Sequence, residues 1–203
     1  MPPLTPEDRK ILALLNTPQK IQDFLDALPQ NHEKNGETCM SPHMVLREKK
    51  AHCIEGAMLA ATALWIAGEK PLVMSLKVSH GDQDHVIALY KKNGHWGAIS
   101  KTNHAVLRFR DPVYRTPREL ALSYFHEYFL TENGKKTMRG YTNPINLKRF
   151  GTKWVNSRDD LWDIGTTIYK MKHIAVVPKG NEKYLRNAHR LERKAASIKE
   201  WKK

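Results

Sequence analysis

The sequence predicts an α+β protein in which a buried helix packs against an antiparallel sheet. Residues 54–67 are almost wholly apolar, rich in Ala, Leu and Met, and are followed by Gly68, which is typical of a core helix and its end. Strand-length apolar runs then follow at 71–78 and 85–91. Helical patterns lie before and after these strands instead of alternating with them, which is the element order of an α+β domain.

Two amphipathic helices are expected ahead of the core helix. Thr5-Pro6 and Thr17-Pro18 each place an N-cap residue before a proline at the first helical position. The apolar residues that follow recur at helical spacing, at Ile11, Leu12 and Leu15 and again at Ile21, Phe24, Leu25 and Leu28. After a polar loop at 29–40, Ser41-Pro42 begins a short helix that leads to Cys53.

The sheet is expected to continue through a hairpin. Asn93-Gly94 is a strong two-residue turn signal because both residues tolerate positive φ, so 96–100 is predicted to be the returning strand. A further extended run is predicted at 105–110, ending at Asp111-Pro112. Thr116-Pro117 then opens a helix with Leu120, Tyr124, Phe125 and Tyr128 on its apolar face.

The last third of the chain is predicted to be mainly helical and basic. Residues 131–153 are predicted to form a long loop, and a helix is expected after Ser157. A short strand is expected at 173–178, followed by a basic amphipathic helix from Glu182. We therefore expect one domain over 1–203, with a core at roughly 18–130 and a helical, basic extension at 131–203.

The chain is strongly basic, with a net charge of +13 over 203 residues. Between 170 and 203 there are eleven Lys and Arg residues against three acidic ones. Such charge suits a nucleic-acid partner, but a basic helix is more often a solvated face, and no nucleic-acid-binding motif is present. We therefore expect no nucleic acid as the main partner.

The chain has only two cysteines, Cys39 and Cys53, and a domain of this size needs no disulfide framework. The charged N-terminal residues 1–10 do not resemble a signal peptide, and no apolar run is long enough to span a membrane. The expected setting is therefore cytoplasmic, with free thiols and no membrane contact. No feature of the sequence sets an oligomeric state.

Cys53 is the candidate nucleophile. It falls in the first turn of the core helix, where free backbone N–H groups and the helix dipole favour a thiolate. A cysteine nucleophile needs a base and a group that orients that base. His85 opens a predicted strand after a polar loop, so it is the leading candidate for the base.

The residues SPHMVLREKKAHCIEGAMLAATALWIAGEKPLVMSLKV, followed by DHVIALYKKNGHW, resemble the core of transglutaminase-like cysteine enzymes, relatives of the papain-like fold. In that family the helix that begins at the nucleophilic Cys ends at a Gly before a Pro-containing turn, here Gly68 and Pro71. The catalytic His opens a strand, here His85, and a hairpin leads to a Trp, here Trp96. The resemblance covers roughly residues 18–110 and implies a Cys53–His85 pair.

The chain departs from the family pattern at two positions. The family usually has Gly before its Cys, where this chain has His52. It usually has an orienting Asp about four residues after the Trp, where this chain has Ser100.

The identity of the third catalytic residue, which would orient His85, is therefore left open. The hairpin register places His85 opposite position 102 or a neighbour, which brings Asn103 within reach. Asn103 is favoured over Asp111, which is expected at the far end of its strand, near the Asn93-Gly94 turn. Ser100 could supply a weaker hydrogen bond.

The expected function is that of a thiol-dependent hydrolase or acyl transferase that acts on an amide or ester through a Cys53 thioester. A peptidase or amidase is favoured over a transglutaminase, with a protein or peptide substrate and no cofactor. The alternative is a non-enzymatic binding module whose basic C-terminal helix binds nucleic acid or an acidic partner.

A zinc site is the competing interpretation of the same residues. Cys39, His43, His52 and Cys53 form one conceivable ligand set, and His80 with His85 forms another. Their spacing matches no structural zinc pattern, so no metal is expected.

Overall fold

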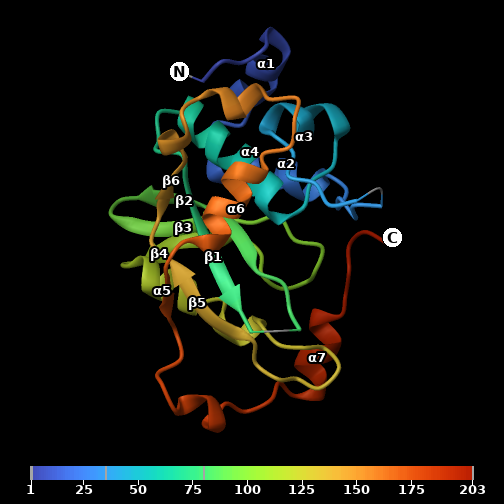
Figure 1. The fold of residues 1–203 in the computed structure, drawn as a ribbon, viewed down its shortest axis with the longest axis vertical. Helices are drawn as coiled ribbons and strands as arrows, with labels where there is room; N and C mark the ends of the chain where they lie inside the picture. The colour runs from blue at the N-terminus through green and yellow to red at the C-terminus, as the bar shows by residue number, and fades with distance from the viewer. Residues whose placement is uncertain (1, 35, 80, 203) are drawn as a thin grey trace.

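The computed structural model describes residues 2–34, 36–79 and 81–202, and these form a seven-stranded antiparallel sheet flanked by helices (Figure 1). The order is β4-β3-β2-β1-β5-β7, with β6 also paired to β1. The strands are β1 Leu72–Val78, β2 His85–Lys92, β3 His95–Ile99, β4 Arg110–Tyr114, β5 Met138–Thr142, β6 Ile145–Asn146 and β7 His173–Ala175. The predicted α+β class with an antiparallel sheet is confirmed.

The helices begin where the N-cap signals predict. Thr5, Thr17, Ser41 and Thr116 each accept a hydrogen bond from a backbone N–H in the first turn of the helix that follows. The α-helices are α1 Pro6–Leu14, α2 Pro18–Ala27, α3 Pro42–Glu48, α4 Cys53–Ile66, α5 Pro117–Leu122, α6 Trp162–Lys170 and α7 Arg190–Ala196. Short 3-10 helices are η1 Phe125–Glu127, η2 Leu147–Phe150, η3 Lys153–Asn156 and η4 Asn181–Tyr184.

The core lies on both faces of the sheet. On β2, Val86 and Ala88 join the apolar cluster that includes α1–α4 and α6, whereas Ile87 and Leu89 join the cluster that includes α5. Alternate side chains of a strand point to opposite faces, so β2 is buried from its first residue to Tyr90. The unbroken apolar run in the sequence therefore reflects a strand covered on both faces.

The predicted hairpin is confirmed in its register. Lys92 pairs with His95, and Asn93 and Gly94 have φ values of 47° and 82°, as a tight turn with positive φ at both positions requires. The β2–β3 pairing ends at Ala88 and Ile99. The chain leaves the sheet at that point, immediately before Ser100 and Asn103, two of the candidates for the third catalytic residue.

The strand predicted at 105–110 is wrong. Leu107 has a φ of 63°, which is incompatible with a strand, and β4 begins only at Arg110 and runs through Pro112. Pro is tolerated there because β4 lies at the edge of the sheet and pairs on one side only.

The long loop predicted at 131–153 and the long helix predicted from Glu182 are also wrong in part. Residues 138–142 form β5, which lies between β1 and β7, and 145–146 form β6. Gly140 permits this close pairing, because a Cβ there would lie 3.0 Å from the Ile174 carbonyl oxygen. The expected C-terminal helix is reduced to η4 and α7, so the last third of the chain supplies strands as well as helices.

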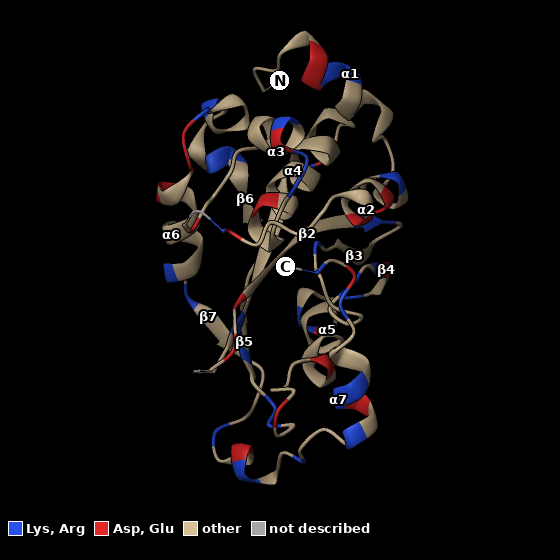
Figure 2. Ribbon diagram, turned by 90° about the vertical axis from the view of Figure 1, so that its right-hand side faces the viewer, with Lys and Arg blue, Asp and Glu red and all other residues tan. Residues whose placement is uncertain are grey.

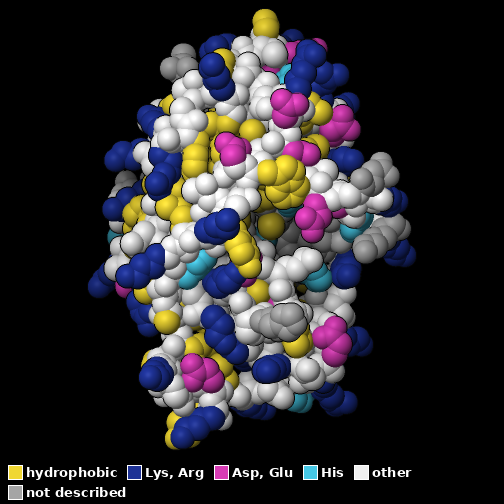
Figure 3. Space-filling view, viewed as in Figure 1, with side chains coloured by type: hydrophobic (Ala, Val, Ile, Leu, Met, Phe, Trp, Pro, Cys, Tyr) yellow, Lys and Arg dark blue, Asp and Glu magenta, His cyan; other side chains and the backbone are white. Residues whose placement is uncertain are grey.

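The positive charge is spread widely. Lys and Arg side chains are scattered over the face shown in Figure 3, and they also mark α7 in Figure 2. Among the described residues, no helix has both the length and the apolar character needed to cross a membrane.

Candidate active site

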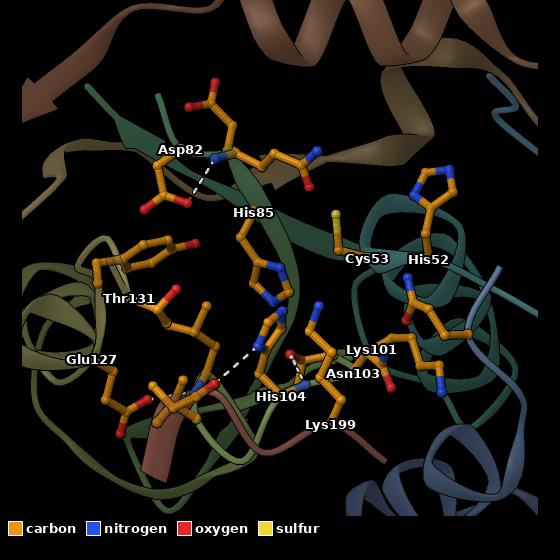
Figure 4. A pocket seen from close by; sticks show the side chains of 18 of the residues that line it. His52, Cys53, Asp82, His85, Lys101, Asn103, His104, Glu127, Thr131 and Lys199 are labelled. Carbon is orange, nitrogen blue, oxygen red and sulfur yellow. Dashed lines mark hydrogen bonds between the residues drawn. The ribbon is translucent and has the colours of Figure 1, made fainter. Parts of the chain in front are cut away.

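A cavity of about 890 Å³ lies at the end of the sheet where β2 begins and β3 ends. Its wall is built from the start of α4, the residues before β2, and residues 101–107 after β3. Residues 30–33, 127–132 and 196–202 complete it. The cavity therefore collects side chains that are far apart in sequence, including Cys53 and His85 (Figure 4).

Cys53 is the first residue of α4 and a partly exposed free thiol. It lies between His52 and His85 in Figure 4. Burial raises the pKa of the Cys53 thiol, but hydrogen bonds from His52 and His85 lower it more, so that the pKa lies well below its usual range. A helix start and two imidazoles together favour the thiolate.

His52, the residue before Cys53, is held as a cation beside this sulfur. Its Nε2 lies 2.9 Å from the Thr38 carbonyl oxygen and 3.3 Å from Glu55 Oε1. Since a carbonyl oxygen can only accept, Nε2 carries a hydrogen. Burial lowers the pKa of His52, but its hydrogen bonds with Cys53 and Glu55 raise it to about 11.

Glu55 is the fully buried counter-ion of His52. Its carboxylate accepts hydrogen bonds from the Thr38 hydroxyl at 2.7 Å and from the backbone N–H groups of His52 at 2.9 Å and Met40 at 3.0 Å. Burial raises its pKa, but the interactions with His52 and these backbone donors lower it to about 2. Glu55 was not singled out from the sequence, although it is the one charged residue of the apolar stretch 54–67.

The hydrogen bonds of His85 set its tautomer. Its Nε2 lies 2.7 Å from Ser100 Oγ, and Ser100 Oγ donates to the Leu107 carbonyl oxygen at 2.6 Å. A hydroxyl has one hydrogen, so Ser100 Oγ must accept from Nε2–H of His85. Nδ1 of His85 is left without a hydrogen in the neutral ring and can accept the proton of the Cys53 thiol.

The backbone N–H, the carbonyl oxygen and the hydroxyl of Ser100 are all hydrogen-bonded. The side-chain amide of Gln22 bonds both backbone groups of Ser100, at 2.8 and 2.9 Å. Leu107, which accepts from the Ser100 hydroxyl, donates its N–H to Glu127 at 2.6 Å, and Glu127 is paired with Arg110. The positive φ of Leu107 is a strained conformation for a non-glycine residue, and such strain persists only where the surroundings fix it.

Of the three candidates for the third member, the structure brings Ser100 to the His85 ring. The side-chain amide of Asn103, the favoured candidate, is instead bonded to the backbone of Trp201, at 2.8 and 2.7 Å. Asp111 is exposed on the edge strand β4. The expectation for Asn103 requires the β2–β3 pairing to continue past Ile99, but this pairing stops there and Gln22 bonds the backbone of Ser100 instead.

Four buried polar atoms have no hydrogen-bond partner among the described residues, and all belong to the wall of this cavity: Gln30 Oε1, His32 Nε2, Tyr128 Oη and Trp201 Nε1. Tyr128 is 2% exposed. Burial, followed by the charge of Cys53, raises the pKa of Tyr128 well above its usual value, so its hydroxyl keeps its hydrogen. Unpartnered polar atoms grouped in this way suit a bound polar molecule.

Cys39 and His43, two of the residues considered as zinc ligands, are buried in other surroundings. Cys39 is 1% exposed, and burial raises the pKa of its thiol to about 12. His43 pairs with Asp8 at 2.8 Å. Within 2–34, 36–79 and 81–202, no three His, Cys, Asp or Glu side chains are grouped so as to hold a metal ion, and His80 lies outside these residues.

Comparison of the chain with protein-family models finds no matching family, and comparison with curated proteins finds no match.

Replacing Ser100 with Ala is expected to slow alkylation of Cys53 by iodoacetamide about tenfold, because the His85 ring loses the acceptor that orients it. Ser100→Thr keeps the hydroxyl and should retain most of the rate. The rate constant for adduct formation at Cys53, followed by mass spectrometry, checks this. Equal rates for Ser100→Ala and the unaltered protein would contradict an orienting role.

Proposed function

We propose that this protein is a thiol-dependent hydrolase or acyl transferase of the transglutaminase-like class, acting on an amide or ester. The observation that carries the proposal is Cys53 at the start of α4, with a lowered thiol pKa, between the His52 cation and the His85 base. The order of Cys helix, His strand and hairpin supports the same class.

Before acylation, the proton of the Cys53 thiol passes to Nδ1 of His85, so that the sulfur is a thiolate when substrate binds. The thiolate attacks the substrate carbonyl carbon, and the carbonyl electron pair moves onto oxygen. Backbone N–H groups in the first turn of α4, which have no acceptor within the helix, supply hydrogen bonds to this oxyanion, and the unpaired Tyr128 hydroxyl is a further donor in the cavity. When the tetrahedral intermediate collapses, His85 gives its proton to the leaving amine or alcohol, and a thioester remains.

Deacylation reverses these roles. His85, neutral again, accepts a proton from water as the water oxygen attacks the thioester carbonyl. Collapse of the second intermediate releases a carboxylic acid, and the proton on His85 returns to the Cys53 sulfur. An amine in place of water would make the reaction a transfer, but hydrolysis is favoured because water needs no second binding site.

His52 and Ser100 have supporting parts in this proposal. His52, fixed by Glu55, stabilises the Cys53 thiolate before it attacks and again when it leaves the thioester. Ser100 keeps the His85 ring in its reactive tautomer. Both cysteines are free thiols, which supports a reducing, cytoplasmic setting. A protein or peptide amide is the proposed substrate.

The test is alkylation with iodoacetamide at mildly acidic pH. We expect Cys53 to react before Cys39, since the pKa of the first thiol is lowered and that of the second is raised. His85→Ala should slow the reaction at Cys53 about tenfold. If Cys53 reacts no faster than Cys39, or is indifferent to His85→Ala, the proposal fails.

A further inference from the structure

The segment at 198–201 pairs with residues 103–105 as one strand pairs with another. The N–H of Ala105 donates to the Ile198 carbonyl oxygen at 3.1 Å, and the N–H of Glu200 donates to the Asn103 carbonyl oxygen at 3.0 Å. His104 and Lys199 form an antiparallel bridge between these two bonds. Residues 103–105 therefore present a short backbone edge that accepts an extended peptide.

Asn103 adds a clasp to this edge. Its Oδ1 accepts the N–H of Trp201 at 2.7 Å, and its Nδ2 donates to the carbonyl oxygen of the same residue at 2.8 Å. Both bonds go to main-chain atoms of Trp201, at a bend that follows the paired residues, so they hold the backbone whatever its side chain. The same two bonds are available to any peptide whose backbone takes the place of this segment.

The paired segment lies in the cavity of Cys53. Lys199, Trp201 and Lys202 are part of the same wall as Cys53 and His85, and Lys199 is drawn beside Asn103 in Figure 4. After α7 the chain returns toward the N-terminal helices in Figure 1, and its end lies over the middle of the molecule in Figure 2. The segment thus lines the same cavity as the nucleophile.

The charge of the wall suits a basic peptide. Apart from this segment, the wall includes five acidic residues, and two of these, Asp84 and Glu127, are paired with Lys77 and Arg110. Lys101, the lysine of the remaining wall, donates its ammonium hydrogens to the carbonyl groups of Leu25 and Leu28. Glu33 lies 3.6 Å from the His52 cation. Two acidic residues of the wall, Asp82 and Glu132, are therefore left without a basic partner among the described residues, and the same wall includes Lys199 and Lys202.

We propose that the cavity binds its substrate as an extended, basic polypeptide segment, paired along residues 103–105 and clasped by Asn103, and that residues 198–202 now occupy this subsite. This inference rests on the proposed function and names its substrate class. The chain's own segment is then a competitor that a substrate must displace. The apparent affinity for substrate is proportional to the fraction of molecules in which the segment has left the subsite.

The experiment measures binding of a fluorescein-labelled peptide Ser-Ile-Lys-Glu-Trp-Lys to the full chain by anisotropy. Glu200→Pro removes the N–H that bonds to Asn103 and releases the segment, so the peptide should bind about tenfold more tightly. Glu200→Ala is the matched control, because it keeps that N–H and loses only the partly exposed ion pair with Arg108, and should change binding less than threefold.

Two further results are expected with Glu200→Pro. Adding Asn103→Ala should weaken peptide binding about tenfold, since both clasp bonds are lost. Saturating peptide should slow iodoacetamide alkylation of Cys53 at least about fivefold by covering it. Equal binding by Glu200→Pro and the unaltered chain, indifference to Asn103→Ala, or binding without protection of Cys53 would each overturn the inference.

A measurement on the unaltered chain covers the case in which Glu200→Pro does not fold. Saturating unlabelled peptide should speed hydrogen exchange at the Glu200 and Trp201 amides by displacing them, and unchanged exchange contradicts displacement. A peptide with Glu at both Lys positions should bind at least about fivefold more weakly, and equal binding overturns the preference for a basic segment. Failure of peptide binding while Cys53 still forms an acyl adduct overturns this inference alone. Peptide binding without any acyl adduct overturns the proposed function instead.

Discussion

Replacing Glu55 with Gln is expected to lower the free energy of unfolding by about 3 kcal/mol at neutral pH. The carboxylate is fully buried and its pKa lies at about 2 instead of 4.5, a difference that corresponds to roughly 3 kcal/mol in favour of the folded state. Gln keeps the size of the side chain but leaves the His52 cation without its buried counter-ion, with only the more exposed Glu33 at 3.6 Å. For a chain of 203 residues the melting temperature should fall by roughly 6–12 °C.

The pH dependence gives this prediction a second readout. Because the pKa of Glu55 is lowered on folding, its stabilisation is fully present above pH 4.5 and is lost as pH falls toward 2. The pKa of His52 is raised on folding, so its stabilisation is fully present below pH 6.5 and is lost as pH rises toward 11. The difference between the unaltered protein and Glu55→Gln should therefore shrink on acidification below pH 4.5.

Urea unfolding followed by circular dichroism measures both effects. Glu48→Gln is the control, because Glu48 is exposed at the end of α3 and its loss should change the free energy of unfolding by less than about 0.5 kcal/mol. A Glu55→Gln protein as stable as the control would contradict a buried ion pair beside Cys53.

Replacing His52 with Gln is expected to slow alkylation of Cys53 about thirtyfold near pH 6. Without the imidazolium, the thiolate loses an adjacent positive charge, so the pKa of the Cys53 thiol rises and less thiolate is present at acidic pH. The rate should approach that of the unaltered protein as pH rises above the new pKa. The measurement is the iodoacetamide rate constant of Cys53 as a function of pH.

His95→Gln is the matched control for this series. His95 lies in the β2–β3 hairpin, where its ring bonds to the Asn93 carbonyl oxygen, away from the cavity. It should leave the pH midpoint of Cys53 alkylation unchanged. A His52→Gln protein with the same midpoint as the control would show that His52 does not stabilise the thiolate.

The parts of the site that the sequence predicted are those set by local signals. Cys53 begins α4 and His85 begins β2 because capping, apolar runs and the Asn93-Gly94 turn are encoded within a few residues. Ser100 could not be ranked first in this way. Its contact with His85 depends on Gln22, which is distant in sequence, and on the positive φ of Leu107.

The errors in the predicted fold have a similar cause, since the deciding contacts are with residues distant in sequence. The sequence of β5 resembles a loop because its five residues include Arg139 and Gly140, although partners on both sides stabilise it as an interior strand. The role of Asn103 depends on a segment almost a hundred positions away, so no local pattern could indicate it. Glu55 is different, since an acidic residue within an apolar helix is a readable signal of a buried ion pair.

The most direct measurement is capture of the Cys53 thioester. The full chain is mixed with p-nitrophenyl acetate near pH 6, and the acetyl group is located by mass spectrometry after rapid quenching. The expected result is an acetyl group on Cys53 that hydroxylamine removes and water slowly releases, with both formation and release slowed in His85→Gln. An acetyl group that never forms on Cys53, that forms as fast on Cys39, or that is indifferent to His85→Gln would contradict a Cys53–His85 thiol enzyme.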